Sequence, residues 1–211
     1  MPSGSAAGAA SRDLPLVYIT RHGQTDWNAE ARLQGQRDIP LNETGRAQAR
    51  ANGRALADLV GTGAAWEGFD FVASPLGRAR ETMEIVRGEL GLNPSDYQTD
   101  DRLKEMSFGD WEGYTFEEME RASGEAIETF RERDKWNFRP PGERAESYAM
   151  LAERIAPWLD ELRQPTLAII HGGVVRSLFR LVGGLSEDEA AHAPDPQDRV
   201  LRMSGGKIGW L

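Results

Sequence analysis

The sequence predicts an α/β protein, a three-layer α/β/α sandwich in which helices cover both faces of a mostly parallel sheet. Short apolar runs rich in β-branched and aromatic residues alternate with amphipathic segments through most of the 211 residues. Strands that alternate with helices in this way typically form a parallel sheet. Polar residues directly follow each apolar run, and such sheets bind ligands beyond the C-terminal ends of their strands. We therefore expect the functional site at that edge.

The expected strands and helices follow from hydrophobic periodicity. Strands are expected at residues 16–20, 69–73 and 166–170, and helices at residues 42–60, 76–90, 147–162 and 174–182. Asn42 is a suitable N-cap for the first helix, and Gly91 is suited to end the second. Pro157 is expected to kink the third helix or to start a new one.

Turn and cap residues indicate two further elements. Thr115 and Glu118 have the spacing of a capping box, which predicts a short helix after them. Residues 199–211 are expected to form a hairpin around Gly205 and Gly206.

Composition limits the classes of protein that this chain can belong to. It is 39% hydrophobic and 28% charged, as in ordinary globular enzymes. It has no cysteine, which excludes disulfides, cysteine-ligated metals and a thiol nucleophile, and which fits a cytoplasmic location. No apolar run is long enough to span a bilayer. The net charge of −9 repels nucleic acid and anionic membranes, so neither is an expected partner.

The first residues differ in composition from the rest. Residues 1–13 are rich in Ser, Ala and Gly and lack the basic and apolar regions of a signal peptide. We expect a disordered tail at 1–13 and a single domain at 14–211.

Three of the predicted strands end in residues suited to bind an anion. Arg21 and His22 follow the first strand, Ser74 and Arg78 follow the second, and His171 follows the third. Both histidines are followed by glycine, which lets the backbone turn sharply and a ligand approach closely. One such histidine alone would be interpreted as a packed loop residue. Two in matching positions, together with two arginines, favour a functional site.

These residue types favour phosphoryl transfer over metal chemistry. The chain has no H-x-H or H-E-x-x-H motif and no cysteine, so a zinc site would lack its usual ligands. Arginine repels cations, whereas its planar fork matches the oxygens of a phosphoryl group. A neutral imidazole is a competent nucleophile at phosphorus, and catalysis there depends mostly on positioning and charge neutralisation. No metal or other cofactor is expected.

At this point the motifs resemble those of the histidine phosphatase superfamily, which includes the cofactor-dependent phosphoglycerate mutases. The matching segments occur in the family's order, from about Leu16 to at least Gly183. They are Arg21-His22-Gly23-Gln24-Thr25-Asp26-Trp27-Asn28, Leu33-Gln34-Gly35, Pro40-Leu41-Asn42, Ser74-Pro75-Leu76-Gly77-Arg78-Ala79, Leu103 to Gly113, and His171-Gly172-Gly173-Val174-Val175-Arg176.

The resemblance implies a role for each matching residue. His22 would be the nucleophile that becomes phosphorylated, and Arg21, Arg78 and His171 would hold the phosphoryl oxygens. Glu105 would give a proton to the leaving alkoxide and later activate water. A dianionic phosphate beside Glu105 would favour its protonated form. Four further positions would contact the substrate, with Gln34 and Gly35 equally well explained as turn residues: Asn28, Gln34, Gly35 and Gly172.

Within the family, the sequence favours a phosphoric monoester hydrolase of the histidine acid type over a mutase. Related mutases read Asn-Glu-Arg-x-Tyr-Gly around the acid, whereas this chain reads Lys104-Glu105-Met106-Ser107-Phe108-Gly109, as in the broad-specificity phosphatases. The following segment, residues 114–147, is short and is expected to cap the site. A non-catalytic phosphate-binding module is a third interpretation. The sequence names no particular phosphate ester, and it leaves the oligomeric state open, a homodimer included.

Overall fold

The helices and strands follow one another in the alternating order that the sequence predicts. The strands are β1 (Val17–Arg21), β2 (Asp70–Ala73), β3 (Gln98–Thr99), β4 (Thr166–Ile170), β5 (Val200–Ser204) and β6 (Lys207–Trp210). The α-helices are α1 (Asp26–Ala29), α2 (Glu43–Val60), α3 (Gly77–Glu89), α4 (Phe116–Glu128), α5 (Tyr148–Glu161), α6 (Gly172–Leu181) and α7 (Glu187–Ala191). Short 3-10 helices lie at Gly63–Trp66, Asp101–Leu103 and Gly109–Trp111.

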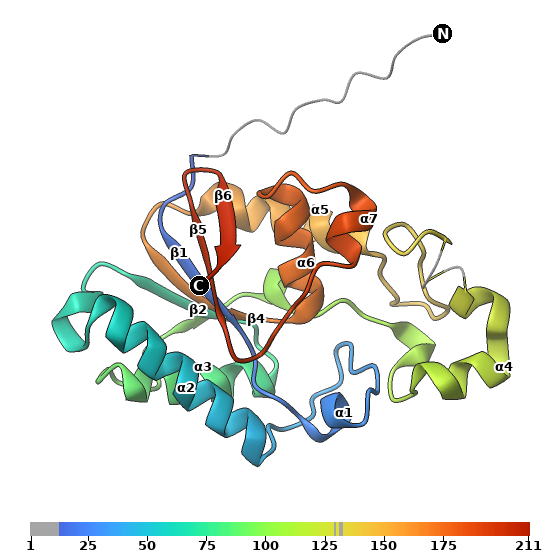
Figure 1. Ribbon diagram of the computed structural model, residues 1–211, viewed down its shortest axis with the longest axis horizontal. Coiled ribbons are helices and arrows are strands. Elements are labelled where there is room, and N and C mark those ends of the chain that lie inside the picture. Colours follow the sequence, from blue (N-terminus) through green and yellow to red (C-terminus); the bar gives the residue numbers. More distant parts are fainter. Residues whose placement is uncertain (1–12, 129, 131–132) are drawn as a thin grey trace, which may run out of the picture.

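This computed structural model describes residues 13–128, 130 and 133–211. The strands in these ranges form one six-stranded sheet (Figure 1). For residues 122–126 only the backbone is described. The strand order is β3-β2-β4-β1-β5-β6. Strands β1 to β4 are parallel to their neighbours among themselves, and β5 and β6 form the predicted antiparallel hairpin around Gly205 and Gly206. The prediction of a mostly parallel sheet is confirmed.

Alternate side chains of the central strands pack into two separate hydrophobic layers, as expected for a pleated sheet with both faces covered. Val17 and Ile19 of β1 belong to the layer that contains residues of α5, α6 and α7. Tyr18, between them, belongs to the layer that contains Leu56 of α2 and Met83 of α3. In Figure 1 these two groups of helices lie on opposite sides of the sheet, which confirms the three-layer sandwich.

The capping residues predicted from the sequence make the expected contacts. The Asn42 side chain accepts a hydrogen bond from Gly45 N at 2.9 Å at the start of α2. Gly91 follows α3 with φ of +72°, a conformation that glycine adopts without strain. Thr115 and Glu118 exchange backbone-to-side-chain bonds of 2.9 and 3.2 Å. The helix ends are therefore set by local sequence.

No new helix starts at Pro157, one of the two outcomes that the sequence predicts there: α5 continues through Pro157 as a single helix from Tyr148 to Glu161. Proline removes one backbone hydrogen bond. Ile155 and Trp158, on either side of it, are both buried against the sheet. Packing of this apolar face outweighs the lost bond.

Two findings concern predictions about the ends of the chain and membranes. The predicted tail at residues 1–13 lies outside the described residues, apart from Asp13. In the described ranges, no helix combines the length and the apolar character needed to cross a bilayer.

Two leucines of α2 offer a test of the helix's packing. Leu56 is completely buried and Leu59 is 52% exposed. We expect Leu56→Ala to lower the free energy of unfolding by about 2–5 kcal/mol, because it leaves a cavity in the layer between α2, α3 and the sheet. The matched Leu59→Ala change should cost less than about 0.5 kcal/mol. Urea denaturation measures both, and equal costs would contradict the assigned orientation of α2.

Candidate active site

Backbone pairing of three adjacent strands brings the predicted site residues to one edge of the sheet. β4 pairs in parallel with both β1 and β2. Just beyond the strand ends, His22 N donates to Ile170 O at 2.9 Å and Ser74 N donates to Ile169 O at 3.0 Å. His22, Ser74 and His171 therefore leave the sheet at the same level, at the C-terminal edge where the sequence places the site.

The ring of His22 is held at both nitrogens, with the lone pair of Nε2 facing Arg78. Nδ1 lies 2.7 Å from the carbonyl oxygen of Gly23, so this nitrogen carries the proton and donates it. Nε2 then keeps its lone pair, which faces the Nε–H of Arg78 at 3.3 Å. Burial, followed by the positive charges of Arg78 and Arg21, lowers the pKa of His22 well below its usual range. The ring is therefore neutral at neutral pH.

Arg78 is completely buried but keeps donors available for an anion. Its Nη1 and Nη2 donate to the carbonyl oxygens of Arg37 and Gly35 at 2.6 and 2.8 Å, and its Nε faces His22. Because a guanidinium has five N–H groups, two are left for another partner. Burial lowers the pKa of Arg78 to about 10 despite the nearby carboxylates of Glu105 and Asp38, so the group stays charged at neutral pH.

Arg21 and His171 each have a buried nitrogen without a hydrogen-bond partner among the residues that the structure describes. Arg21 Nη1 pairs with the Asp195 carboxylate at 2.9 Å, while its buried Nε makes no hydrogen bond. His171 Nε2 lies 2.7 Å from Ser74 Oγ, while its buried Nδ1 makes none. The His171 ring centroid is 5.0 Å from that of His22. Buried polar atoms are rarely left without partners, so these two nitrogens fit a site for phosphoryl oxygens.

The side chain of Glu105 reaches the N-terminal end of α6. Backbone amides of Gly173 in this helix and of Met106 hold its carboxylate. Oε1 accepts from Met106 N at 2.8 Å, and both oxygens accept from Gly173 N at 3.1 and 3.2 Å. A Cβ at position 173 would collide with this carboxylate, so glycine is required for the contact. The arrangement places a carboxyl group in the same cavity as His22, in reach of a leaving group or a water molecule.

The four predicted substrate-binding residues line the same cavity, which has a volume of about 120 Å³. The Oδ1 of Asn28 accepts from Thr25 N, and its amide nitrogen has no partner among the described residues. Gln34 Oε1 is buried without a partner. Gly35 adopts φ of +53° and gives its carbonyl to Arg78, so it serves as a turn residue. A Cβ at Gly172 would collide with the Asp195 carboxylate in its present position.

The structure adds cavity residues that sequence reasoning did not select. Asp195 bridges Arg21 and Arg176, at 2.9 and 2.7 Å. Arg176 also donates to the hydroxyl of Tyr148 at 3.0 Å, and Arg32 lies on the cavity wall. Burial opposes the charge on Arg176, but Tyr148 and Asp195 outweigh it and raise its pKa. Arg176 belongs to the motif that begins at His171, which was the one sequence signal available.

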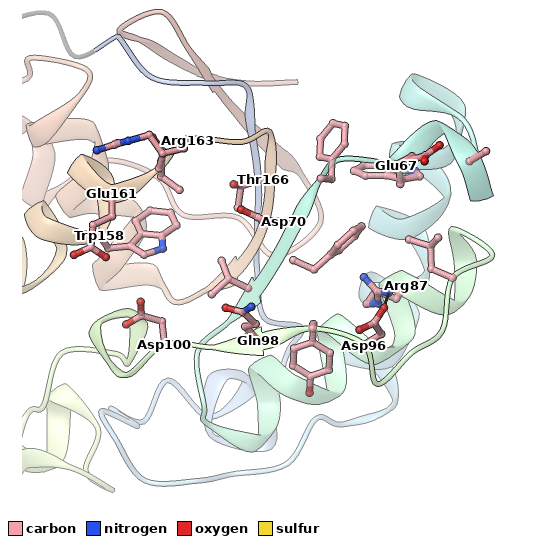
Figure 2. Close-up of a pocket in the computed structure, with 18 of the residues that line it drawn as sticks. Glu67, Asp70, Arg87, Asp96, Gln98, Asp100, Trp158, Glu161, Arg163 and Thr166 are labelled. Carbon is pink, nitrogen blue, oxygen red and sulfur yellow. Dashed lines mark hydrogen bonds and ion pairs between the residues drawn. The ribbon is translucent and has the colours of Figure 1, made fainter.

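A larger cavity, of about 920 Å³, lies elsewhere and contains none of the predicted site residues. Figure 2 shows its lining, with Asp70 and Thr166, the first residues of β2 and β4, near its centre. It is thus at the opposite ends of these strands from His22 and His171. Size alone does not identify the reactive site in this fold.

No three His, Asp or Glu side chains among residues 13–128, 130 and 133–211 lie close enough together to hold a metal ion. Metal independence of the reaction stays a prediction.

The buried histidines predict how stability depends on pH. Burial and nearby arginines lower the pKa of both His22 and His171 below the usual 6.5, whereas the unfolded chain takes up protons near that value. The unfolded state therefore binds more protons at mildly acidic pH. The free energy of unfolding should fall as the pH drops from about 7.5 to about 5.5, by up to about 1.4 kcal/mol per pH unit for each histidine.

Replacing His171 by Gln should flatten this pH dependence, because the amide does not titrate. Urea denaturation of both proteins across this pH range measures the two slopes. An unchanged slope in His171→Gln would contradict a neutral, buried His171.

Comparison with known proteins places these features in a family. Residues 17–204 match the histidine phosphatase superfamily, branch 1. A protein of Bacillus subtilis named as the uncharacterized phosphatase PhoE is 34% identical over 176 residues, which cover 81% of this chain and 79% of PhoE. The 2,3-bisphosphoglycerate-dependent phosphoglycerate mutase of Methylobacterium radiotolerans is 33% identical over 195 residues, or 88% of this chain and 85% of the mutase.

Solved structures of related proteins have the same fold. A mycobacterial glucosyl-3-phosphoglycerate phosphatase in complex with VO3 has a TM-score of 0.75 and 28% identity, over 93% of this chain and 96% of that chain. The match extends over almost the whole described sheet and its helices, and it confirms both the resemblance and the phosphoglycerate mutase-like fold expected from the ordered motifs. The chain belongs to the histidine phosphatase superfamily.

Proposed function

We propose that this protein hydrolyses phosphate monoesters through a phosphohistidine on His22, without a metal ion. The observation that carries the proposal is the orientation of the His22 ring. Nδ1 is bound to the Gly23 carbonyl, so the lone pair of Nε2 is available beside the guanidinium of Arg78. A neutral, oriented imidazole next to buried cations is suited to attack phosphorus.

In the first half of the reaction, Nε2 of His22 forms a bond to phosphorus as the bond from phosphorus to the ester oxygen breaks. Glu105 supplies the proton that the departing alkoxide needs. Arg21, Arg78 and His171 neutralise the charge on the phosphoryl oxygens, using the N–H groups that have no protein partner.

In the second half, water replaces the imidazole. Glu105, now a carboxylate held by Met106 N and Gly173 N, accepts a proton from the attacking water. The bond from phosphorus to Nε2 breaks, inorganic phosphate leaves and the neutral ring of His22 is restored. The same carboxyl group acts first as an acid and then as a base, as expected for two displacements on one face of phosphorus.

The charges around the cavity support a monoester substrate. Four arginines line it, namely Arg21, Arg32, Arg78 and Arg176, together with the carboxylates of Glu105 and Asp195. The excess of positive charge suits a dianionic phosphate.

Residues 114–147 are proposed to form the wall that selects the substrate. This segment begins against the cavity, where Tyr114 O accepts from Leu33 N at 3.0 Å. The carboxylate of Glu118 binds both Nη atoms of Arg32 at 2.7 and 3.1 Å. After the segment, Tyr148 lines the cavity with its ring stacked on Trp136 at 5.8 Å. These contacts support a cap over the site rather than a remote insertion.

Two alternatives are distinguished by assay. One relative is named as a phosphoglycerate mutase, so mutase activity is the second candidate, and it requires phosphoryl transfer to an acceptor other than water. A non-catalytic module would bind inorganic phosphate but would not hydrolyse p-nitrophenyl phosphate. Release of phosphate from a panel of monoesters in excess EDTA separates all three.

Substitution of His22 tests the nucleophile. Brief reaction with a phosphate-labelled monoester in excess EDTA should leave label on the protein that is lost in acid, because phosphohistidine is acid-labile. His22→Ala should abolish both the label and turnover. His192→Ala is the matched control, because the His192 side chain is 46% exposed and does not line the cavity. It should retain both the label and turnover. Normal turnover in His22→Ala would eliminate the mechanism.

Substitution of Glu105 tests the proton donor. Glu105→Gln keeps the size and hydrogen-bonding oxygen of the side chain but cannot supply the proton. Turnover of alkyl phosphates, whose leaving groups are strongly basic, should fall on the order of a hundredfold or more. Turnover of p-nitrophenyl phosphate should fall clearly less, because p-nitrophenolate leaves without a proton.

Asp110→Asn, at an exposed carboxylate near Glu105 in sequence, is the matched control and should change neither rate. Equal losses with both substrates in Glu105→Gln would indicate a positioning role and contradict proton donation.

A further inference from the structure

A loop near the C-terminal end of the chain makes hydrogen bonds to His22 and Asn28 of the site. Residues 193–197 lie in the connection between α7 and β5 and are separated from the first strand by about 170 positions in sequence. Their side chains are absent from the chemical steps described above. Gln197 nevertheless makes two hydrogen bonds to the site, both through its amide nitrogen.

The amide nitrogen of Gln197 uses its two hydrogens on different partners. Nε2 donates to the main-chain oxygen of His22 at 3.1 Å and to Oδ1 of Asn28 at 3.1 Å. The backbone of Gln197 is itself fixed, because its carbonyl accepts from Nδ2 of Asn52 at 2.9 Å. Asn52 lies on α2 and is buried. The backbone that carries the donor is thus anchored to α2.

These bonds decide which end of the Asn28 amide faces the cavity. Oδ1 of Asn28 accepts from Thr25 N at 3.1 Å as well as from Gln197, and it lies 3.2 Å from Thr25 Oγ1. A rotated amide would set its NH₂ group against the N–H groups of Thr25 and Gln197, which leaves both of these donors without an acceptor. The Nδ2 group of Asn28 is therefore the end left for a ligand.

The orientation matters because the two ends of an amide act oppositely on phosphate. Nδ2 donates to a phosphoryl oxygen, whereas Oδ1 in the same place would repel it. We propose that Gln197 is a positioning residue that holds Asn28 with its N–H donors toward the phosphoryl group. This inference rests on the proposed phosphoryl-transfer function, since it gives Asn28 a phosphate to bind.

The test is a double-mutant cycle between Gln197 and Asn28. Gln197→Met keeps the length of the side chain and removes the donor. It should lower kcat/KM for p-nitrophenyl phosphate and weaken orthovanadate binding by about tenfold, as for loss of a hydrogen bond to a charged group. In the Asn28→Ala background, the same change should cost less than about threefold, because the amide that Gln197 orients is gone and only the bond to His22 O is lost. Asp198→Asn, at the exposed neighbouring position, is the matched control and should match the wild type.

The outcomes separate this inference from the function on which it rests. Equal losses in the two backgrounds, with wild-type turnover present, would show that Gln197 does not act through Asn28 and would overturn the positioning role alone. Absence of both turnover and orthovanadate binding in the wild type would overturn the proposed function and this inference together. If Gln197→Met fails to fold, Gln197→Glu provides the same cycle with an isosteric side chain. Its oxygens only accept, so it should cause the larger loss in the wild-type background and again a smaller one beside Asn28→Ala.

Discussion

The pairing of β4 with β1 on one side and β2 on the other is the constraint on which the site depends. In a parallel ladder, the register of one strand sets the level at which its neighbours leave the sheet. Here the bonds from His22 N to Ile170 O and from Ser74 N to Ile169 O continue both ladders past the strand ends. Residues that are about 50 to 150 positions apart in sequence therefore meet within a few ångströms. Slipping either register by one residue would turn these side chains to the opposite face.

Once these residues meet, the protein has to hold several cations in a buried place. The partners of these cations are neutral backbone carbonyls and one carboxylate that two arginines share. Arg78 is bound by the carbonyls of Gly35 and Arg37, and Asp195 is shared by Arg21 and Arg176. Burial among these arginines keeps both histidines neutral. The result is a locally basic cavity in a chain whose net charge is −9, so the attraction for a phosphate is short-ranged and acts inside the cavity.

Much of this arrangement was predictable because the signals are local. Apolar runs, caps and breakers located the main strands and helices, and polar residues after three strands located the site. Elements without a local signal were missed. Strand β3 is two exposed residues, Gln98–Thr99, whose conformation is imposed by pairing with β2. Pro157 is a local signal for a kink or a helix start, and no new helix starts there because α5, packed on the sheet, continues past it.

The sequence by itself determined the layered α/β architecture, the edge that carries the site, and the residue types suited to bind and attack a phosphoryl group. These depend on periodicity and on residues that directly follow a strand. Only the tertiary structure decided which nitrogen of His22 keeps its lone pair, that Gly173 holds Glu105, and that Asp195 and Gln197 support Arg21 and Asn28 from the far end of the chain. Such contacts join positions up to 175 residues apart. No periodicity or motif records them, because they arise from packing of separate elements and not from the order of residues within one.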